Sequence, residues 1–335
     1  MSKLVQITFS NHSDVALTRT DAKGNWQDGN EPSASVESQT GVGWATEGDG
    51  HVTYRIGDDD TAVLTFAWDD AHGGTYHFDL SSGWELLVSV DNETFDVHFG
   101  PTNPRVVEGF TPSANGFAFP NTFPDDAALK TIDLGVTKLP IGKAANGLCG
   151  GMTFGARDYF EAGVAIPADT ESPTGQGVPL FDYLVDRQIA SFDLPHLPAT
   201  LLAIMNPAYP DHDGGILGHF GADGRARLMA RSEFAKIRAA IDGGKPCPIC
   251  IIKAKSANPA ALGENHQVLV YGYQVDGTQL TLWVYDPNNP GHDDAGLVLD
   301  IGRTDKTIDV AVSIENLNSI YCYVVTNYQP AAPPG

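Results

Sequence analysis

The sequence is poor in basic residues and in cysteine. Its 335 residues include 20 Lys and Arg against 42 Asp and Glu, which gives a formal charge of −22. Nucleic acids and anionic lipids are bound through clustered Lys and Arg, so this balance argues against both as partners. Four cysteines are too few for a disulfide scaffold, and each is therefore judged by its own surroundings.

Long apolar runs are also missing. No window approaches the roughly 18 consecutive apolar residues of a transmembrane helix. The segment from Met1 to Phe9 alternates like a strand instead of forming the apolar core of a secretory signal. We therefore expect no transmembrane segment and no standard signal peptide. The chain is then cytoplasmic at synthesis, and export by a leaderless route stays open.

The composition is that of a folded chain. Hydrophobic residues make up 42% of it and aromatic residues 9%, whereas disordered chains lack the apolar surface that offsets the entropy of ordering. At roughly 150 residues per domain, the length indicates about two domains.

Period-two alternation marks residues 1–100. Short runs at 5–9, 51–56, 62–68 and 86–90 alternate between apolar and polar side chains and are separated by Gly, Asp and Asn. Alternation at this spacing, without a helical period, predicts an all-β sandwich. The same residues carry 17 Asp and Glu against 4 Lys and Arg, so this domain holds more than half of the net negative charge.

A segment rich in proline and glycine follows, at residues 101–139. This composition predicts an extended connector. The segment also carries four phenylalanines, Phe110, Phe117, Phe119 and Phe123. Such aromatic side chains rarely lie in water, so we expect the connector to lie across the surfaces of the domains that it joins.

Residues 140–328 show helical patterns first and strand patterns afterwards. The helices are expected over 152–160, 179–189 and 231–241. The strands are expected over 250–252, 267–273, 279–285 and 320–325. We therefore expect a multi-domain chain in which an all-β sandwich precedes an α+β domain with an antiparallel sheet, ending in a flexible tail at 329–335.

Cys149 lies in the segment NGLCGGM (residues 146–152), where the first of these helices is expected to begin. The positive end of a helix dipole favours the thiolate, which is the form that attacks a carbonyl carbon. Flanking glycines let a substrate backbone approach closely. The alternative is a small buried residue at a tight corner between strand and helix.

His266 begins one predicted strand and Asp286 ends the next. The Asp276-Gly277 pair between them permits a two-residue type I′ loop or a three-residue loop with Gly277 in the left-handed bulge position. Only the three-residue loop gathers the valines and leucines of both strands on one face, and register follows the buried face. It places His266 directly opposite Asp286, with Cβ atoms about 4.5 to 5.5 Å apart.

Taken singly, these residues have ordinary structural explanations. A histidine at a strand end is commonly hydrogen-bonded there, and an aspartate before proline commonly starts a turn. Together, a cysteine, a histidine and an aspartate supply the three roles of nucleophilic catalysis. Cys149 is then the nucleophile, His266 the base that later protonates the leaving group, and Asp286 the group that fixes the imidazole tautomer.

Four segments resemble papain-like cysteine peptidases, in particular the bacteriocin-processing branch. They are NGLCGGM, the Lys245-Pro246 approach to a strand, NHQVLVYGY (265–273) and VYDPN (284–288). The resemblance covers roughly residues 140–326. It implies a papain-like fold, a thiol protease or a related amidase or acyltransferase, a peptide or amide substrate, and the three roles above for Cys149, His266 and Asp286.

One position departs from the family's pattern. Relatives usually carry glutamine six residues before the cysteine, where it helps to form the oxyanion hole, and that place is Lys143 here. Asn146 offers a replacement from another direction, aided by the Cys149 backbone N–H. Peptidase, transferase and inactive relative all stay open.

The remaining candidate sites have simpler explanations. Cys247 and Cys250 have the spacing of half a zinc site or of a redox pair, but no second pair accompanies them, and a buried strand is favoured. Cys322 also falls in a predicted strand. The acidic loop 211–215 offers metal ligands and equally the residues of a turn. We expect no metal and no cofactor.

The first domain resembles the aegerolysins, small β-sandwich proteins that bind membrane lipids. The resemblance spans about residues 4–80 and is carried by the strand start QIT (6–8), NHS (11–13), WATEG (44–48) and FAWD (66–69). It implies recognition of a neutral or zwitterionic lipid head group through loop tryptophans. The alternative is that the tryptophans fill the sandwich core. They are Trp26, Trp44, Trp68 and Trp84.

Two functions therefore compete. The first is a thiol hydrolase, most simply a cysteine peptidase, whose β-sandwich targets or orients it. The second is a lipid- or membrane-binding protein whose papain-like domain is inactive. We favour catalysis, because a degenerate enzyme is expected to lose some of its three polar groups first.

Overall fold

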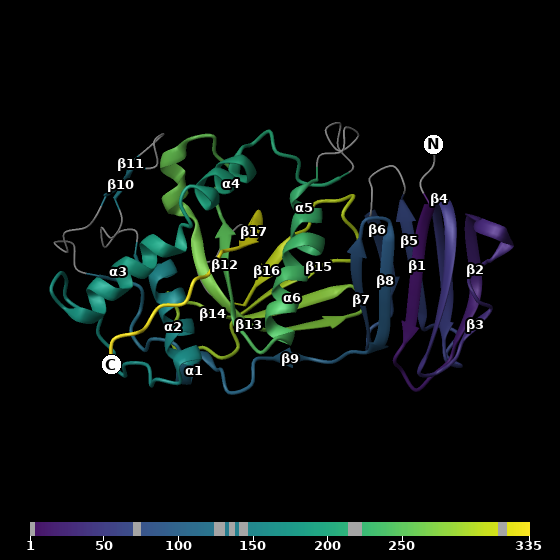
Figure 1. The fold of residues 1–335 in the computed structure, drawn as a ribbon, viewed down its shortest axis with the longest axis horizontal. Helices are drawn as coiled ribbons and strands as arrows, with labels where there is room; N and C mark the ends of the chain where they lie inside the picture. The colour runs from purple at the N-terminus through teal and green to yellow at the C-terminus, as the bar shows by residue number, and fades with distance from the viewer. Residues whose placement is uncertain are drawn as a thin grey trace. The chain divides into compact units, whose positions relative to one another are not determined.

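The computed structural model describes residues 4–69, 75–123, 131–133, 138–140, 147–213, 223–313 and 320–335. The chain is β-rich and forms two compact units, each with its own large sheet (Figure 1). Unit 1 comprises residues 1–104, 274–280 and 300–306, and unit 2 comprises the rest. The expectation of a multi-domain, β-rich chain is therefore confirmed.

Unit 1 holds an eight-stranded sheet in which the strands follow the order β3-β2-β4-β1-β8-β7, with β5 joining β4 to β6. The strands are β1 (Leu4–Asn11), β2 (Leu17–Trp26), β3 (Ser35–Val36), β4 (Thr40–Ile56), β5 (Val63–Asp69), β6 (Thr75–Leu80), β7 (Trp84–Asp91) and β8 (Thr94–Pro101). Strand β4 pairs with β1 through residues 40–47 and with β5 through residues 50–55. One long strand thus changes partners midway, as strands do at the corner of a folded sheet.

The core of unit 1 follows from the alternation in its strands. In β1 the side chains of Val5, Ile7 and Phe9 are buried while Leu4, Gln6 and Thr8 between them are exposed. Because side chains alternate across a strand, one apolar face is presented to the core. Phe9 packs there on the rings of a tryptophan and a tyrosine, with centroids 6.3 and 5.7 Å away.

Two segments from the second half of the sequence also belong to unit 1. The carboxylate of Asp276 accepts hydrogen bonds from the Ser82 hydroxyl at 3.0 Å and the Gly83 N–H at 2.6 Å. The Phe78 N–H donates to the carbonyl oxygen of Gly302 at 2.9 Å. Residues 274–280 and 300–306, which lie within the domain expected over residues 140–328, thus group with unit 1.

Unit 2 is built on the sheet β16-β15-β14-β13-β12-β17, with β9 paired to β13. Its strands are β9 (Arg105–Val106), β12 (Cys247–Ile252), β13 (His266–Asp276), β14 (Gln279–Tyr285), β15 (Gly296–Asp300), β16 (Val310–Val312) and β17 (Cys322–Val325). A separate pair joins β10 (Thr131–Asp133) to β11 (Lys138–Pro140). The expected strand regions of this half are all present, although several begin or end a few residues away from their expected bounds.

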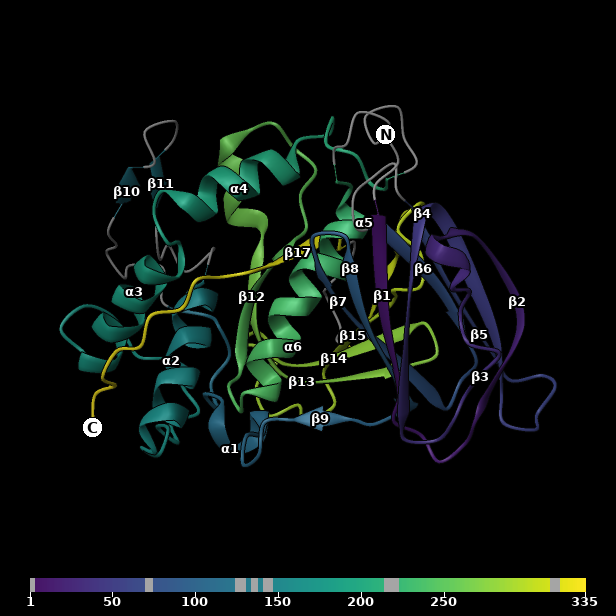
Figure 2. The same ribbon diagram turned by 45° about the vertical axis from the view of Figure 1, so that its right-hand side comes forward.

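The helices of unit 2 lie around this sheet. They are α1 (Pro112–Asn115), α2 (Cys149–Ala162), α3 (Pro179–Ser191), α4 (His196–Met205), α5 (Arg225–Arg227) and α6 (Phe234–Asp242), with a π-helix at Leu228–Glu233 and a 3-10 helix at Pro259–Glu264. Helices α2 and α3 lie side by side (Figures 1 and 2). Helix α4 was not predicted, although its buried residues Leu197, Leu201 and Ile204 recur at helical spacing.

The phenylalanines of the connector lie in the core of unit 2. Phe117 and Phe119 are fully buried, and they pack with Leu148, Met152 and Tyr159. The segment was expected to lie across domain surfaces, and that expectation is wrong for its aromatic residues. Its extended backbone lets closely spaced rings reach the interior, where burying each ring stabilises the fold by a few kcal/mol.

The C-terminal segment binds to helices α2 and α3. The Arg187 guanidinium donates to the carbonyl oxygen of Gln329 at 2.6 Å, and the Tyr159 hydroxyl donates to that of Pro334 at 2.8 Å. The Ala331 N–H donates to the buried carboxylate of Asp158 at 2.9 Å. The tail was expected to be flexible from residue 329, but these hydrogen bonds hold its backbone along the helices.

Candidate active site

Cys149 is the first residue of helix α2, and its side chain is 8% exposed. Two side chains bind backbone N–H groups at this helix start, where the helix itself supplies no acceptor. The Asn121 carboxamide oxygen accepts from the Leu148 N–H at 2.5 Å, and the Gln188 carboxamide oxygen accepts from the Gly151 N–H at 2.8 Å. The contacts of the described residues give the Cys149 N–H no acceptor.

The glycines beside Cys149 serve packing within the protein. A Cβ on Gly150 would overlap the Ser191 hydroxyl, and one on Gly151 would overlap the carbonyl oxygen of Leu184. These glycines were expected to let a substrate backbone approach closely. The structure instead uses them to bring α3 against the first turn of α2, which fixes the direction of that turn.

His266 is the first residue of β13, and its ring lies against a carboxylate. Its Nε2 atom is 2.6 Å from Oδ1 of Asp286, and the two residues are 5% and 1% exposed. The His266 imidazole and the Cys149 thiol also lie close enough for each to shift the pKa of the other. Because Nε2 faces Asp286, Nδ1 is the ring nitrogen left for the sulfur. The structure thus brings Cys149, His266 and Asp286 together.

The hairpin that carries the histidine and the aspartate has a different turn from the one expected. Strand β13 runs to Asp276 and β14 begins at Gln279, so the turn is Gly277-Thr278. Neither considered turn is present, and the expected register is wrong. Asp286 still reaches His266 because it lies just beyond the end of β14, where its side chain is free of the strand's strict alternation.

A turn after β14 holds the Asp286 carboxylate in place. Its Oδ1 atom accepts from the Asn288 N–H at 2.9 Å and its Oδ2 atom accepts from the Asn289 amide at 3.0 Å. Such turns, in which an aspartate binds the backbone two residues later, are common at Asp-Pro. The loop therefore binds both carboxylate oxygens, and Oδ1 also accepts from His266.

These contacts favour the charged forms of all three groups. Burial alone would raise the pKa of the Cys149 thiol, but the His266 imidazole and the N–H groups of Gln267 and Gly150 together lower it. Burial would lower the pKa of His266, whereas the hydrogen bonds to Asp286 and Cys149 raise it to about 10. The pKa of Asp286 is lowered by His266 despite burial. The arrangement is that of a thiolate and imidazolium pair.

Residues outside the predicted set complete the surroundings of the nucleophile. The Gln267 amide donates to the Ser191 hydroxyl at 3.0 Å, and the Thr153 hydroxyl donates to the Gln267 carbonyl oxygen at 3.2 Å. Gln188, Ser191 and Gln267 are all at most 5% exposed. Polar residues on the apolar sides of α3 and β13 are the sequence signal that marks them, since buried polar groups are normally hydrogen-bonded.

The oxyanion hole was expected to involve Asn146. Asn146 lies outside the described residues, and so does Lys143, which stands where the family's pattern has glutamine. The Cys149 N–H, at the positive end of α2, is the described group suited to stabilise a negative oxygen next to the sulfur.

The other three cysteines lie in strands, and the pKa values of their thiols are raised. Cys247 and Cys250 belong to β12 and Cys322 to β17, and each is at most 2% exposed. Burial raises the pKa of Cys247 to about 12 and raises the pKa values of the other two further. Among the residues that the structure describes, no cluster of three or more His, Cys, Asp or Glu has the arrangement of a metal site.

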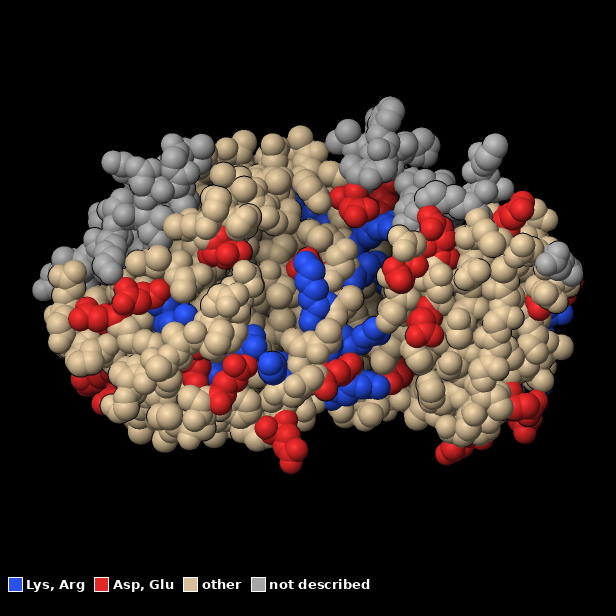
Figure 3. Space-filling model, in the orientation of Figure 1, with Lys and Arg blue, Asp and Glu red and all other residues tan. Residues whose placement is uncertain are grey.

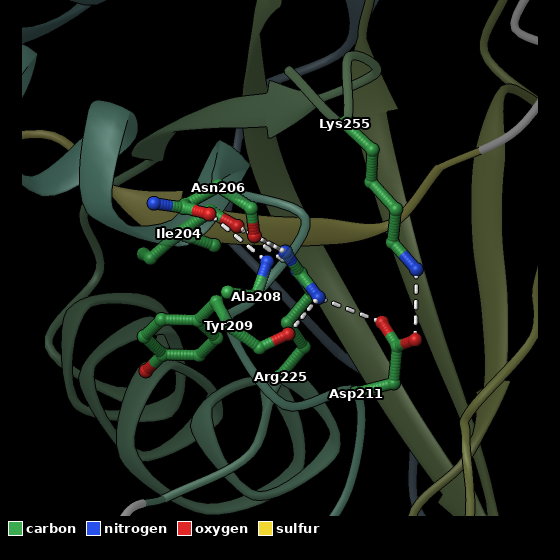
Figure 4. A network of polar contacts seen from close by, with 7 residues as sticks. All are labelled: Ile204, Asn206, Ala208, Tyr209, Asp211, Arg225 and Lys255. Carbon is green, nitrogen blue, oxygen red and sulfur yellow. Dashed lines mark hydrogen bonds and ion pairs between the residues drawn. The ribbon is translucent and has the colours of Figure 1, made fainter. Parts of the chain in front are cut away.

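The acidic loop at 211–213 takes part in a structural network (Figure 4). Arg225, only 1% exposed, donates to four acceptors. They are the carbonyl oxygens of Ile204, Asn206 and Tyr209 and the carboxylate of Asp211. Lys255 also binds the Asp211 carboxylate, at 2.7 Å, and Asp213 accepts from the Gly224 N–H. These carboxylates are therefore engaged by protein groups.

On the face shown in Figure 3, Lys and Arg side chains gather in the region of α6. Residues 225–245 carry six of the 20, namely Arg225, Arg227, Arg231, Lys236, Arg238 and Lys245. Arg227 pairs with Asp223 at 3.2 Å and Lys236 with the buried Glu233 at 2.6 Å. Much of this positive charge is therefore compensated locally.

A cavity of about 410 Å³ opens beside α4, the π-helix and β17. Its lining combines apolar side chains, among them Leu197, Ile204 and Val324, with the charged Asp193 and Lys236. None of the three triad residues lines it.

The tryptophans of unit 1 mainly pack within it. Trp44 and Trp68 are 5% and 3% exposed, and Trp26 and Trp84 are half-buried. Trp68 also donates to the Gly48 carbonyl oxygen at 3.1 Å. No exposed tryptophan occurs among the described residues, so lipid binding through loop tryptophans stays a prediction without a structural argument. Within the same residues no helix has the length and apolar character needed to cross a membrane.

Comparison with known proteins adds little. No family model and no curated protein matches the chain. The solved structures that match include that of IP-1A from Alcaligenes faecalis, which is 9% identical, with a TM-score of 0.24 over 30% of this chain and 91% of IP-1A. A likeness at this level carries no argument about fold or function.

Proposed function

We propose that the chain is a thiol hydrolase, most simply a cysteine peptidase, in which Cys149 is the nucleophile. One observation carries the proposal: a buried sulfur at a helix N-terminus lies beside an imidazole that is itself hydrogen-bonded to a buried carboxylate. The order of helices and strands in unit 2 supports the papain-like relation, because the nucleophile begins its first long helix and the base begins a central strand.

The chemistry follows from the charge states. The Cys149 thiolate attacks the carbonyl carbon of an amide, and the carbonyl oxygen becomes negative beside the Cys149 N–H. The His266 imidazolium gives its proton to the departing amine as the C–N bond breaks, which leaves a thioester. His266 then takes a proton from water, whose oxygen attacks the thioester carbon. The C–S bond breaks, which releases the carboxylic acid and regenerates the Cys149 thiolate.

Asp286 keeps this cycle working without accepting a proton itself. Its hydrogen bond to Nε2 directs Nδ1 at the sulfur and stabilises the imidazolium. The two loop N–H donors in turn hold the carboxylate ionised.

Selective alkylation tests the nucleophile. At pH 6 iodoacetamide should modify Cys149 and spare the other three cysteines, whose pKa values are raised by burial. Peptide mapping by mass spectrometry locates the label. Cys149→Ala should abolish it, and Cys322→Ala, which removes a buried thiol elsewhere, should leave it unchanged. Equal labelling of the wild type and Cys149→Ala would refute the activated thiol.

A peptide library then tests the reaction. The wild type is incubated with peptides of diverse sequence, and new termini are read by mass spectrometry. We expect cleavage that is absent with Cys149→Ala and with His266→Ala. Rapid alkylation of Cys149 without any cleavage would favour the acyltransferase or small-amide alternatives over the peptidase.

A further inference from the structure

Asn121 reaches the active site from a segment that the sequence marked only as connector. Its side-chain oxygen accepts from the Leu148 N–H at 2.5 Å, one residue before the nucleophile. The neighbouring Pro120 carbonyl oxygen accepts from the Ser172 hydroxyl at 3.0 Å, and the rings of Phe117 and Phe119 anchor the same segment in the core. Asn121 is therefore presented by a firmly held backbone.

The same residue binds the loop that carries Asp286. The Asn121 N–H donates to the Pro287 carbonyl oxygen at 2.9 Å, and its side-chain amide donates to Oδ1 of Asn288 at 3.0 Å. The Asn288 N–H in turn donates to the Asp286 carboxylate at 2.9 Å. Asn121 thus contacts the nucleophile turn and the aspartate loop at once, although the two are far apart in sequence.

The turn before the nucleophile is shaped around this side chain. Gly147 has φ +63°, a conformation that favours glycine, and a Cβ at this position would overlap the Asn121 carboxamide. The close fit leaves the carboxamide little freedom, so its two hydrogen bonds set the spacing between the turn and the loop.

We propose that Asn121 is a positioning residue for the Cys149 and His266 pair, because it ties the start of α2 to the Asp286 loop. This inference rests on the proposed function. Without the tie, the sulfur and the imidazole still occupy the same region, but their separation is less well fixed. A looser hydrogen bond stabilises the thiolate less, and misplacement of reacting groups by about 1 Å can cost on the order of 100-fold in rate.

The test is the pH profile of Cys149 alkylation in Asn121→Ala. We expect the midpoint of the acid limb to rise by about one pH unit, which lowers the alkylation rate below the midpoint about tenfold. Ser172→Ala is the matched control, since it removes one hydrogen bond from the same segment without touching the turn or the loop. Its midpoint should equal that of the wild type, even if both variants lose similar thermal stability.

Asn288→Ala provides a second measurement if Asn121→Ala does not fold. It removes only the outer contact, from an exposed side chain, so a smaller shift in the same direction is expected. The positioning role would be overturned if every one of these two variants that folds, Asn121→Ala or Asn288→Ala, showed the alkylation midpoint of the wild type. Failure of the proposed function gives a different result, because Cys149 of the wild type would then show no low-pH labelling at all.

Discussion

The thiolate of Cys149 depends on His266, and His266→Ala measures how strongly. Burial opposes a thiolate at this position, and the imidazole is the largest influence that favours it. Cys247 shows the direction in which burial acts, because it is similarly enclosed without an imidazole partner and burial is the main cause that raises its pKa to about 12. In His266→Ala we therefore expect the Cys149 pKa to move from below the ordinary value for a thiol to above it.

The size of the effect at pH 6 follows from the thiolate fraction. A thiol with an ordinary pKa of about 8.5 is about 0.3% ionised at pH 6, whereas the paired thiol of the wild type is ionised whenever the pH exceeds its lowered pKa. A low-pKa thiolate is also a weaker nucleophile, which offsets part of the difference. We expect a net loss of about tenfold or more in alkylation rate at pH 6.

The assay is the rate of iodoacetamide alkylation from pH 4 to pH 11, with thiolate absorbance near 240 nm as an independent reading. The wild type should show a plateau bounded below by the lowered Cys149 pKa and above by loss of the imidazolium at about 10. His266→Ala should show a single rise above the ordinary thiol range. Superimposable profiles for the two proteins would refute the pairing of Cys149 with His266.

Three further substitutions have defined outcomes. Asp286→Asn removes the carboxylate that raises the pKa of His266 to about 10, so the upper limit of the plateau should fall toward 6.5; an unchanged upper limit would contradict that role. Gly150→Ala places a methyl group against the buried Ser191 hydroxyl. It should lower the free energy of unfolding, measured by urea titration, by about 1 to 3 kcal/mol. An unchanged free energy of unfolding would argue against the close packing of α3 on α2. Arg187→Ala leaves Asp158, which is 2% exposed, without its ion pair at 2.6 Å. The free energy of unfolding should fall by about 3 to 5 kcal/mol. A fall of less than about 1 kcal/mol would mean that the ion pair contributes little to stability.

The candidate triad was predictable because each member carries a local signal. Cysteine before paired glycines at a helix start, histidine at the start of an apolar strand and aspartate before proline are visible in the sequence. The strands of the first half could be predicted in the same way, since the alternation of apolar and polar residues in a strand is a local property of the sequence. These features depend on residues within a few positions of one another.

The correct hairpin turn could not be read in the same way. The expected register came from sorting apolar residues onto one face, and that criterion fails because both faces of β13 are buried. With no polar face to mark the outside, the pattern does not discriminate between registers. The contacts of Asp276 with the Ser82-Gly83 turn are equally invisible to any local pattern.

The sequence by itself determined which groups perform the proposed chemistry and which half of the chain is β. Only the tertiary structure decided what holds those groups: Asn121 from the connector, Gln188 and Ser191 from α3, and the burial that makes His266 and Cys149 depend on each other. The physical reason is range. A helix start or a strand is specified by neighbouring residues, whereas the spacing of a sulfur and an imidazole is set by hydrogen bonds between segments that meet only after the chain has folded.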